Sequence, residues 1–372
     1  MKILISLLFV KAGKVGGAEH MAYNLVIGLA KLPVSLVLVA TRPDQISDSF
    51  KKSIGYFENV EVNYTGSKKS RFIQEQFLAL SKEKFDGVIF PNYFCPPLVR
   101  TNLGTVLTVI HDLQYKKMPE NFPLIKRLWL SLCHSISLRN SDKVVAISNF
   151  VRDDILHFFD HKFAIKLTTI YNPISWERFN SSGVGSGHDR EYLLSVAAHY
   201  PHKNILTLVK AFDEIKEQIP QYDLLLIGQF SGALSSQVSY GQDILQVIEE
   251  LGIEHRVKAL GYLNDAELGE YYAGASVFVF PSLFEGFGMP PIEAMGLGVP
   301  VITTKCGSLE EVTLGRANYV ENPKDVKELS AEILRVLDED TNMELVKCDA
   351  EKVRNCYLPD RIAKQYTDLI SD

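Results

Sequence analysis

The sequence predicts an α/β protein of two domains, each built on a parallel β-sheet. Its 372 residues exceed what a single hydrophobic core usually serves and suit two domains of ordinary size. Along the whole chain, short apolar runs rich in β-branched residues alternate with amphipathic stretches. This alternation is typical of strand-helix-strand units and therefore of parallel sheets.

Strands are predicted wherever an apolar run is short and bounded by turn residues, and helices fill the gaps between them. In the first half these runs are Lys2–Phe9, Val34–Ala40, Asn59–Tyr64, Asp86–Pro91, Thr105–His111, Lys143–Ile147 and Leu167–Tyr171. The basic and then apolar N-terminus is interpreted as the first of these strands rather than as a leader peptide, because its apolar stretch is short and Lys11 and Lys14 follow it.

The second half repeats the same pattern. Its predicted strands are Tyr192–Ala198, Asp223–Gly228, Val257–Leu260, Ser276–Phe280, Val299–Thr303 and Asn318–Val320. The clearest helix lies between the first two of them, where apolar residues recur at helical spacing and predict a core-facing side. These residues are Ile205, Leu208, Val209, Phe212, Ile215 and Ile219.

A glycine and serine cluster at residues 180–188 separates the halves and predicts a flexible linker. We therefore expect an N-terminal domain over residues 1–175, a linker over 176–190 and a C-terminal domain over 191–356. Residues 357–372 form a separate helical segment at the C-terminus.

Composition excludes several classes of protein. Charged residues make up 23% and the net charge is −6, which argues against electrostatic binding of nucleic acid. The five cysteines are scattered without metal-ligand or redox spacing, which favours a reduced, cytoplasmic protein. No apolar run reaches the length of a membrane-spanning helix, so any membrane contact is expected at the surface.

The most informative segment is Phe280–Met295, which reads as a strand, a glycine-rich turn and a helix opened by Pro290 or Pro291. At such a turn, backbone N–H groups and the positive end of the helix dipole converge on one point and favour an anion, such as a diphosphate. Glu285 lies in the loop and Glu293 is expected on the first turn of the helix, so both can reach one ligand.

The spacing Glu285, seven residues, Glu293, with Gly286 to Pro290 between them, resembles the signature of retaining nucleotide-sugar glycosyltransferases of the GT-B fold (family 4, group 1). Further motifs follow in that family's order and cover nearly the whole chain. They are Gly16-Gly17-Ala18-Glu19, Ile110-His111-Asp112-Leu113, Ala146-Ile147-Ser148, Tyr171-Asn172-Pro173, His202-Lys203-Asn204 and Leu309-Glu310-Glu311-Val312.

The resemblance implies two Rossmann-like domains with parallel sheets facing a central cleft, the acceptor on the N-terminal side and the nucleotide-sugar donor on the C-terminal side. It also implies that the C-terminal helix returns to the N-terminal domain. His111 and Glu285 would be catalytic. The donor would be bound by Gly16, Gly17, Lys203, Gly228, Tyr262, Leu263, Phe287, Gly288, Met289 and Glu293.

Lys203 would neutralise the donor diphosphate and Glu293 would hold the ribose hydroxyls. The family often places an arginine a few residues before this lysine, whereas this chain has His199 and His202 in the stretch. No cofactor and no metal are expected, because Lys203 and helix ends would meet the charge of the leaving diphosphate.

The expected function is hexose transfer, with mannose from GDP-mannose favoured, to a glycan or polyprenyl-diphosphate-linked acceptor in surface polysaccharide synthesis. Cations and large apolar residues share the segment 116–130, which fits either docking on a membrane or an ordinary amphipathic core helix. The alternatives are a nucleotide-sugar epimerase or phosphorylase on the same fold, or a non-catalytic glycan- or nucleotide-binding module. The residues leave open whether retention uses a covalent intermediate or front-face attack.

Overall fold

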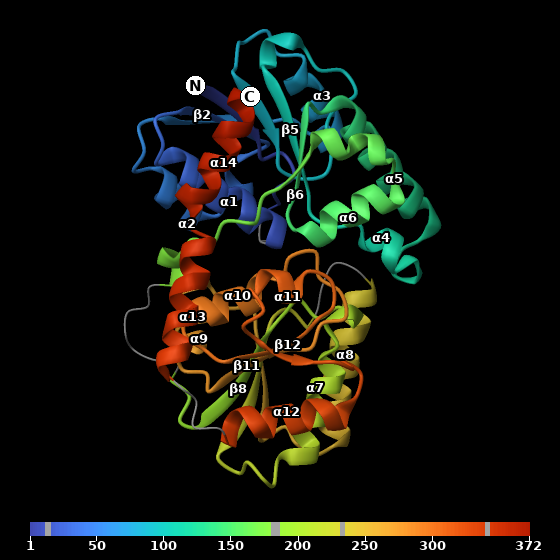
Figure 1. The fold of residues 1–372 in the computed structure, drawn as a ribbon, viewed down its shortest axis with the longest axis vertical. Helices are drawn as coiled ribbons and strands as arrows, with labels where there is room; N and C mark the ends of the chain where they lie inside the picture. Colours follow the sequence, from blue (N-terminus) through green and yellow to red (C-terminus); the bar gives the residue numbers. More distant parts are fainter. Residues whose placement is uncertain (12–15, 180–186, 231–234, 339–342) are drawn as a thin grey trace. The chain divides into compact units, whose positions relative to one another are not determined.

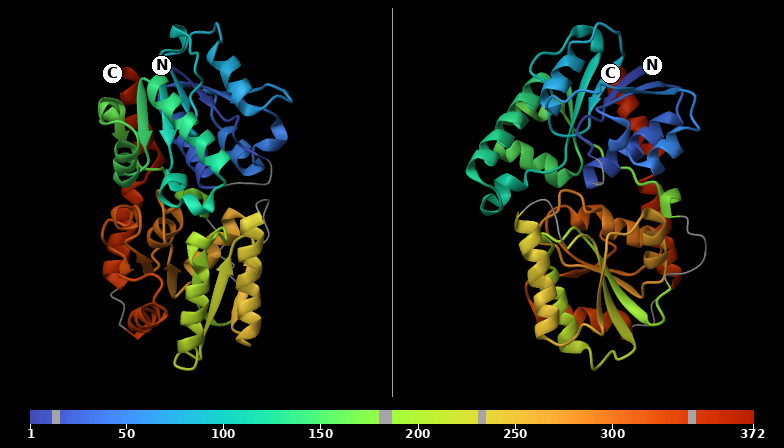
Figure 2. Two further views of the ribbon diagram at one scale, coloured as in Figure 1. Left: turned by 90° about the vertical axis from the view of Figure 1, so that its right-hand side faces the viewer. Right: turned by 180° about the vertical axis from the view of Figure 1, so that it is seen from behind.

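The computed structural model describes residues 1–11, 16–179, 187–230, 235–338 and 343–372. Contacts between Cα atoms divide the chain into two compact units. Unit 1 comprises Met1–Ser175 together with Tyr357–Asp372, and unit 2 comprises Trp176–Cys356. Each unit is an α/β layer structure with helices on both faces of one sheet (Figures 1 and 2).

Unit 1 contains a seven-stranded sheet whose paired strands all run parallel, in the order β3-β2-β1-β4-β5-β6-β7. The strands are β1 Lys2–Ser6, β2 Ser35–Ala40, β3 Val60–Tyr64, β4 Gly87–Phe90, β5 Thr105–Ile110, β6 Lys143–Ala146 and β7 Leu167–Thr169. The helices are α1 Gly17–Ala30, α2 Asp48–Ile54, α3 Arg71–Ala79, α4 Gln114–Lys117, α5 Leu124–Asn140, α6 Asn149–Phe158 and α14 Pro359–Ser371. Short 3-10 turns cover Pro43–Gln45, Thr101–Leu103, Pro119–Asn121 and His161–Lys166.

Unit 2 contains a six-stranded parallel sheet in the order β10-β9-β8-β11-β12-β13. The strands are β8 Glu191–Val196, β9 Tyr222–Ile227, β10 Val257–Gly261, β11 Val277–Phe280, β12 Val301–Thr304 and β13 Asn318–Val320. The helices are α7 Ile205–Ile215, α8 Ser235–Glu250, α9 Asp265–Ala273, α10 Met289–Gly296, α11 Leu309–Val312, α12 Val326–Asp338 and α13 Met343–Cys356. The 3-10 turns are Trp176–Phe179 and Pro201–Lys203.

The predicted α/β class with two parallel sheets is confirmed, and each predicted strand matches an observed one within a few residues. The largest difference is at β1, which ends at Ser6 and not at Phe9. Leu7 to Val10 are nevertheless buried, so they are apolar because they enter the core and not because they extend the strand. The apolar face expected on α7 is buried, although Ile219 lies beyond the end of that helix.

The C-terminal helix α14 packs against α1, which confirms the expected return of the chain to the N-terminal unit (Figure 1). Its buried face consists of Pro359, Ile362, Ala363, Tyr366 and Ile370. The two helices approach so closely that a Cβ atom on Gly28 of α1 would lie 2.2 Å from the carbonyl oxygen of Pro359. Glycine at position 28 is therefore a packing requirement.

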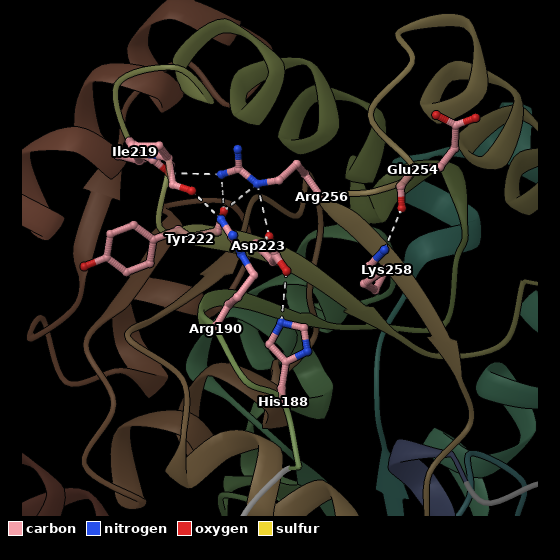
Figure 3. A network of polar contacts seen from close by, with 9 residues as sticks. His188, Arg190, Ile219, Tyr222, Asp223, Glu254, Arg256 and Lys258 are labelled. Atoms are coloured by element: carbon pink, nitrogen blue, oxygen red, sulfur yellow. Dashed lines mark hydrogen bonds and ion pairs between the residues drawn. The ribbon is translucent and has the colours of Figure 1, made fainter.

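Most of the glycine and serine cluster in the predicted linker lies outside the described residues, since 180–186 are not described. Where the description resumes, His188 and Arg190 are attached to the start of β9 by a polar network (Figure 3). The Asp223 carboxylate, almost fully buried, accepts hydrogen bonds from His188 Nε2 at 3.1 Å and from the Nε atoms of Arg190 and Arg256 at 3.0 Å. This network lies at the amino ends of the strands, so we assign it a structural role.

Each sheet has a topological switch point, where strands that follow one another along the chain begin to be added on the opposite side of the first strand. In unit 1 it lies between β1 and β4, and in unit 2 between β8 and β11. Open α/β sheets bind their ligands outside the carboxyl ends of the strands at such points. The fold therefore marks one candidate location in each unit.

Candidate functional site

In unit 2, the loop that follows β11 is held in place by side-chain hydrogen bonds from several directions. Asn204 Nδ2 donates to the Pro281 carbonyl at 3.1 Å, and Thr304 Oγ1 donates to the Ser282 carbonyl at 2.7 Å. The backbone N–H of Ser308 donates to the Glu285 carbonyl at 3.0 Å. A Cβ atom on Gly307 would lie only 2.2 Å from this same oxygen, so the loop also depends on a glycine there. The glycine-rich turn is consequently a fixed platform.

Lys203 and Glu285 meet at the switch point of the unit 2 sheet. Lys203 ends the 3-10 turn after β8, and Glu285 lies in the loop after β11. The Lys203 Nζ lies 2.5 Å from Glu285 Oε1, and the same oxygen accepts a hydrogen bond from Ser282 Oγ at 2.7 Å. Both side chains are mostly buried, at 14% and 11% exposed. Two residues 82 positions apart thus form one polar centre, with its cation held where an anionic ligand is expected.

Glu293 is more enclosed than the sequence suggested. Helix α10 begins at Met289, so Glu293 starts its second turn and not its first, which corrects that expectation. The Arg178 guanidinium donates to Oε1, and the Tyr272 hydroxyl donates to Oε2 at 3.0 Å. Burial raises the pKa of Glu293, against the opposing effects of Arg178 and Tyr272. Each oxygen keeps a second lone pair, so a ribose hydroxyl would have to share a carboxylate that is already hydrogen-bonded.

The other residues predicted for donor binding in unit 2 fall into two groups. Phe287, Gly288 and Met289 form the turn into α10, and Gly288 takes the positive φ of 83° at its N-cap. Pro290 and Pro291 occupy the first turn and carry no backbone N–H, so the helix offers fewer donors than a typical N-terminus. Gly228, Tyr262 and Leu263 follow β9 and β10 instead, and the Tyr262 side chain is exposed.

In unit 1, the structure places His111 directly after β5 and half-buried. Its Nε2 lies 2.7 Å from the Pro91 carbonyl oxygen, which can only accept, so Nε2 carries the proton. Burial lowers the pKa of His111. The neutral ring therefore has an unprotonated Nδ1 that can accept a hydrogen bond from a hydroxyl.

Gly16 and Gly17 lie at the start of α1, with Gly16 as its N-cap. A Cβ atom on Gly17 would meet no other atom within 4 Å. Packing in this structure therefore gives no reason for a glycine at position 17. The preceding residues 12–15 lie outside the described part of the chain.

Sequence reasoning missed Arg178 and Tyr272, the two partners of Glu293. Arg178 lies in the 3-10 turn Trp176–Phe179, which was assigned to the linker. The missed signal was the presence of two aromatic residues in that segment: Trp176 packs against Gly296, where a Cβ atom would lie 2.3 Å from the indole ring. A flexible linker rarely contains large aromatic side chains that need burial.

Among the described residues, no helix combines the length and apolar character needed to cross a bilayer.

Two family models match consecutive parts of the chain. The model described as "Glycosyltransferase Family 4" matches residues 15–178, and "Glycosyl transferases group 1" matches residues 177–352. The matched stretches include His111 in the first and Lys203, Glu285 and Glu293 in the second.

Curated relatives point the same way. The chain is 31% identical to O-antigen chain mannosyltransferase B of Escherichia coli over 270 residues, which are 68% of this chain and 66% of the relative. It is 29% identical to O-antigen chain mannosyltransferase RfbU of Salmonella typhimurium over 240 residues, which are 64% and 62% of the two chains. The matches thus span just under two thirds of the length of these relatives.

Solved structures show the fold. Sucrose-phosphate synthase from Thermosynechococcus elongatus superposes with a TM-score of 0.78 at 22% identity, covering 99% of this chain and 98% of that one. Anabaena Alr3699/HepE, solved with UDP-glucose, gives a TM-score of 0.74 at 19% identity and covers 100% and 99%. On these matches and the parallel sheets of the two units, the chain belongs to the family 4 (group 1) glycosyltransferases and has their GT-B fold.

Proposed function

We propose that this protein transfers a hexose, with retention of anomeric configuration, from a nucleoside-diphosphate sugar to a glycan or lipid-linked glycan acceptor. The observation that carries the proposal is the Lys203–Glu285 centre at the switch point of the unit 2 sheet. A cation at this place opposes the charge that develops on a departing diphosphate. Glu285, the predicted catalytic carboxylate, lies beside it.

Mannose from GDP-mannose is the favoured donor. Both curated relatives described above are named mannosyltransferases, at 31% and 29% identity. The structural neighbour with UDP-glucose is a more distant match, at 19% identity. Binding of GDP and UDP should therefore be compared directly. The relatives' names also support an O-antigen type of surface polysaccharide as the acceptor.

The residue roles proposed for the donor are supported by the contacts within each unit. Lys203 exchanges part of its contact with Glu285 for a phosphate oxygen, and the Gly286 to Met289 turn approaches the same group. Glu293, fixed by Arg178 and Tyr272, accepts from the ribose with its remaining lone pairs. In unit 1, His111 is the proposed catalytic histidine, with an unprotonated Nδ1 that can accept a hydrogen bond.

The acceptor side is proposed to reach a membrane surface through the exposed face of α5. Leu124, Ile125, Leu128, Trp129 and Leu132 are all exposed and share one side of this helix at helical spacing. Lys126 lies among them and is exposed, and Lys116 precedes them. An apolar stripe with cations beside it matches a bilayer with anionic headgroups. This exposed face supports membrane docking over an ordinary core helix for the segment.

The test is nucleotide binding by calorimetry to Lys203→Ala. Loss of a charge-assisted phosphate contact should weaken binding of GDP by about 1.5–3 kcal/mol, or about ten- to a hundredfold. Lys210→Ala, on the exposed side of α7, is the matched control and should bind like the wild type. Unchanged GDP and UDP affinities in Lys203→Ala would remove this centre from the donor site. Conversion of the nucleotide sugar into its epimer, without any acceptor, would indicate an epimerase instead.

A further inference from the structure

A second polar centre lies at the switch point of the unit 1 sheet and contains none of the residues assigned to the donor. Ser6 is the last residue of β1, and Tyr93 follows shortly after β4. Helix α3 brings Arg71 and Glu75, four residues apart and thus on one side of the helix, to the same place. Ser6 Oγ donates to Glu75 Oε1 at 3.4 Å.

This centre has hydrogen-bonding groups that the protein leaves unused. Glu75 is 2% exposed, yet its Oε2 has no hydrogen-bond partner among the residues that the structure describes, and neither has Nη2 of Arg71. Buried polar atoms almost always have partners, and the exceptions call for an explanation. One side chain lacks a donor and its neighbour lacks an acceptor, so a single group able to both donate and accept would satisfy the two.

The surroundings of Arg71 are aromatic and rigid. Its guanidinium lies over the rings of Phe72 and Tyr93, 4.7 Å from each centroid. Tyr93 is fixed through its backbone, because its N–H donates to the Val109 carbonyl at 2.8 Å and its carbonyl accepts from Ser137 Oγ at 2.8 Å. Its φ of 36° lies in the left-handed region, which non-glycine residues seldom adopt. Strained residues of this kind are over-represented at ligand sites.

The charges of the centre favour a neutral, hydroxyl-rich ligand over an anion. The Arg71 cation acts on the carboxylates of both Glu19 and Glu75, so it is not an uncompensated positive charge. Burial raises the pKa of Glu75 to about 7, which lets this carboxyl group donate as well as accept near neutrality. Arg71, Phe72 and Tyr93 are half-buried, so one side of the centre is reachable. Hydroxyls bind such groups, and the C–H faces of a sugar pack on aromatic rings.

We propose that Arg71, Glu75 and Tyr93 form a subsite for one ring of the acceptor sugar. The Arg71 Nη2 donates to a ring hydroxyl, and Glu75 Oε2 accepts a hydrogen bond from the same or the adjacent hydroxyl. Because Arg71 lies over the Tyr93 ring and His134 stacks on that ring at 5.4 Å between centroids, the sugar meets Tyr93 at the edge of its ring. The proposal names the acceptor side of the proposed glycosyl transfer and in that respect rests on it. These residues position the acceptor and take no part in bond breaking.

The experiment measures sugar binding directly and needs no turnover. Saturation-transfer NMR is recorded on the full-length protein with the methyl α-glycosides of mannose, glucose, galactose and N-acetylglucosamine as probes. The variants Arg71→Met and Glu75→Gln are compared with Arg100→Met and Glu120→Gln, which change the same residue types at exposed positions of unit 1. Thermal unfolding confirms that each variant is folded, and Tyr93→Leu serves as a third variant should Arg71→Met fail to fold.

We expect at least one probe to receive saturation from the wild type, and its dissociation constant to rise at least about tenfold in Arg71→Met and Glu75→Gln while the two controls match the wild type. Overturning results would be the absence of any signal from the wild type with all four probes, or equal signals in the wild type and both variants. GDP binding is titrated in parallel. The affinity for GDP should be the same in these variants as in the wild type. Failure of the donor assignment would therefore appear in the GDP titration, and the NMR result on sugar binding could still be interpreted.

Discussion

At the scale of single residues, two buried carboxylates differ in how many of their oxygens have hydrogen-bond partners. Glu293 has a donor on each oxygen, from Arg178 and from Tyr272. Within the described part of the chain, Glu75 has a long contact from Ser6 on one oxygen and no partner on the other. A fully paired acid rigidifies its surroundings, whereas a half-paired one costs stability until a ligand arrives.

This difference predicts how stability responds to pH. The pKa of Glu75 is raised by burial from 4.5 to about 7, so between these values the folded chain binds more protons than the unfolded chain. Stability therefore falls as the pH rises through this window. Glu75→Gln removes the effect and should be more stable than the wild type at pH 8, by up to about 3 kcal/mol, and similar to it near pH 4. Urea unfolding at pH 4, 6 and 8 measures this, with Glu120→Gln as the control. A difference independent of pH would show that folding does not raise the pKa of Glu75.

At the scale of elements, α14 is an integral part of unit 1, although it is last in the sequence. Thr105 Oγ1 donates to the Ile370 carbonyl at 3.2 Å, and a Cβ atom on Gly87 of β4 would lie 2.7 Å from the Ile370 side chain. Glycines at positions 28 and 87 thus make room for one helix. Neither position could be recognised as a packing glycine without knowing where the C-terminus lies.

Gly28→Ala tests the docking of α14 on α1, because here the substitution should destabilise the protein, whereas glycine to alanine normally stabilises a helix. In an ordinary helix interior, alanine is about 1 kcal/mol more favourable than glycine. Here the new Cβ atom would collide with the Pro359 carbonyl, 2.2 Å away, so α14 must shift and stability should fall by about 1–3 kcal/mol. Thermal unfolding reports the change. In a chain that ends at Leu358, and thus lacks α14, Gly28→Ala should no longer be destabilising. A higher melting temperature for full-length Gly28→Ala would contradict the close packing of α14 on α1.

At the scale of the whole molecule, charge and apolar surface are distributed unevenly. The net charge of −6 would keep the protein away from anionic surfaces, yet the exposed apolar stripe of α5 lies among cations. A second exposed apolar stripe is formed by Ile73 and Phe77 of α3 and by its C-cap residue Leu80. Trp129 of α5 packs edge-on against Phe72 of α3 at 5.2 Å between ring centroids. Exposed apolar surface concentrated on neighbouring helices is a common mark of an interaction face.

We therefore expect the protein to sediment with vesicles that contain phosphatidylglycerol and to remain free of purely zwitterionic vesicles. The double variant Ile125→Ser, Trp129→Ser should lose this binding, because burial of each large apolar side chain contributes about 1.5–3 kcal/mol. Ile165→Ser removes an isoleucine side chain elsewhere in unit 1 that is 91% exposed, against 83% for Ile125, and is the matched control. Self-association of the wild type that is abolished by the double variant, without vesicle binding, would assign the face to a second copy of the chain.

The strands, the α/β class and the glycosyltransferase signature could be predicted from the sequence because they are carried by local patterns. Hydrophobic runs of strand length, the apolar spacing of α7 and the Glu285 to Glu293 segment are each contained in a short window of residues. The bounds of such segments shift by a few residues, as at β1, since burial and strand pairing need not end together.

Only the tertiary structure decided which distant side chains complete one another. Lys203 forms an ion pair with Glu285, and Arg178 donates a hydrogen bond to Glu293. Arg71 and Glu75 lie near Ser6, and each keeps an atom without a hydrogen-bond partner among the described residues. These outcomes depend on the order of strands in each sheet, which brings β8 next to β11 and β1 next to β4. Local patterns do not encode strand order, because it results from the global competition to bury apolar surface. The sequence therefore determined the elements and the family, and the fold determined which polar groups are paired and which remain available to a ligand.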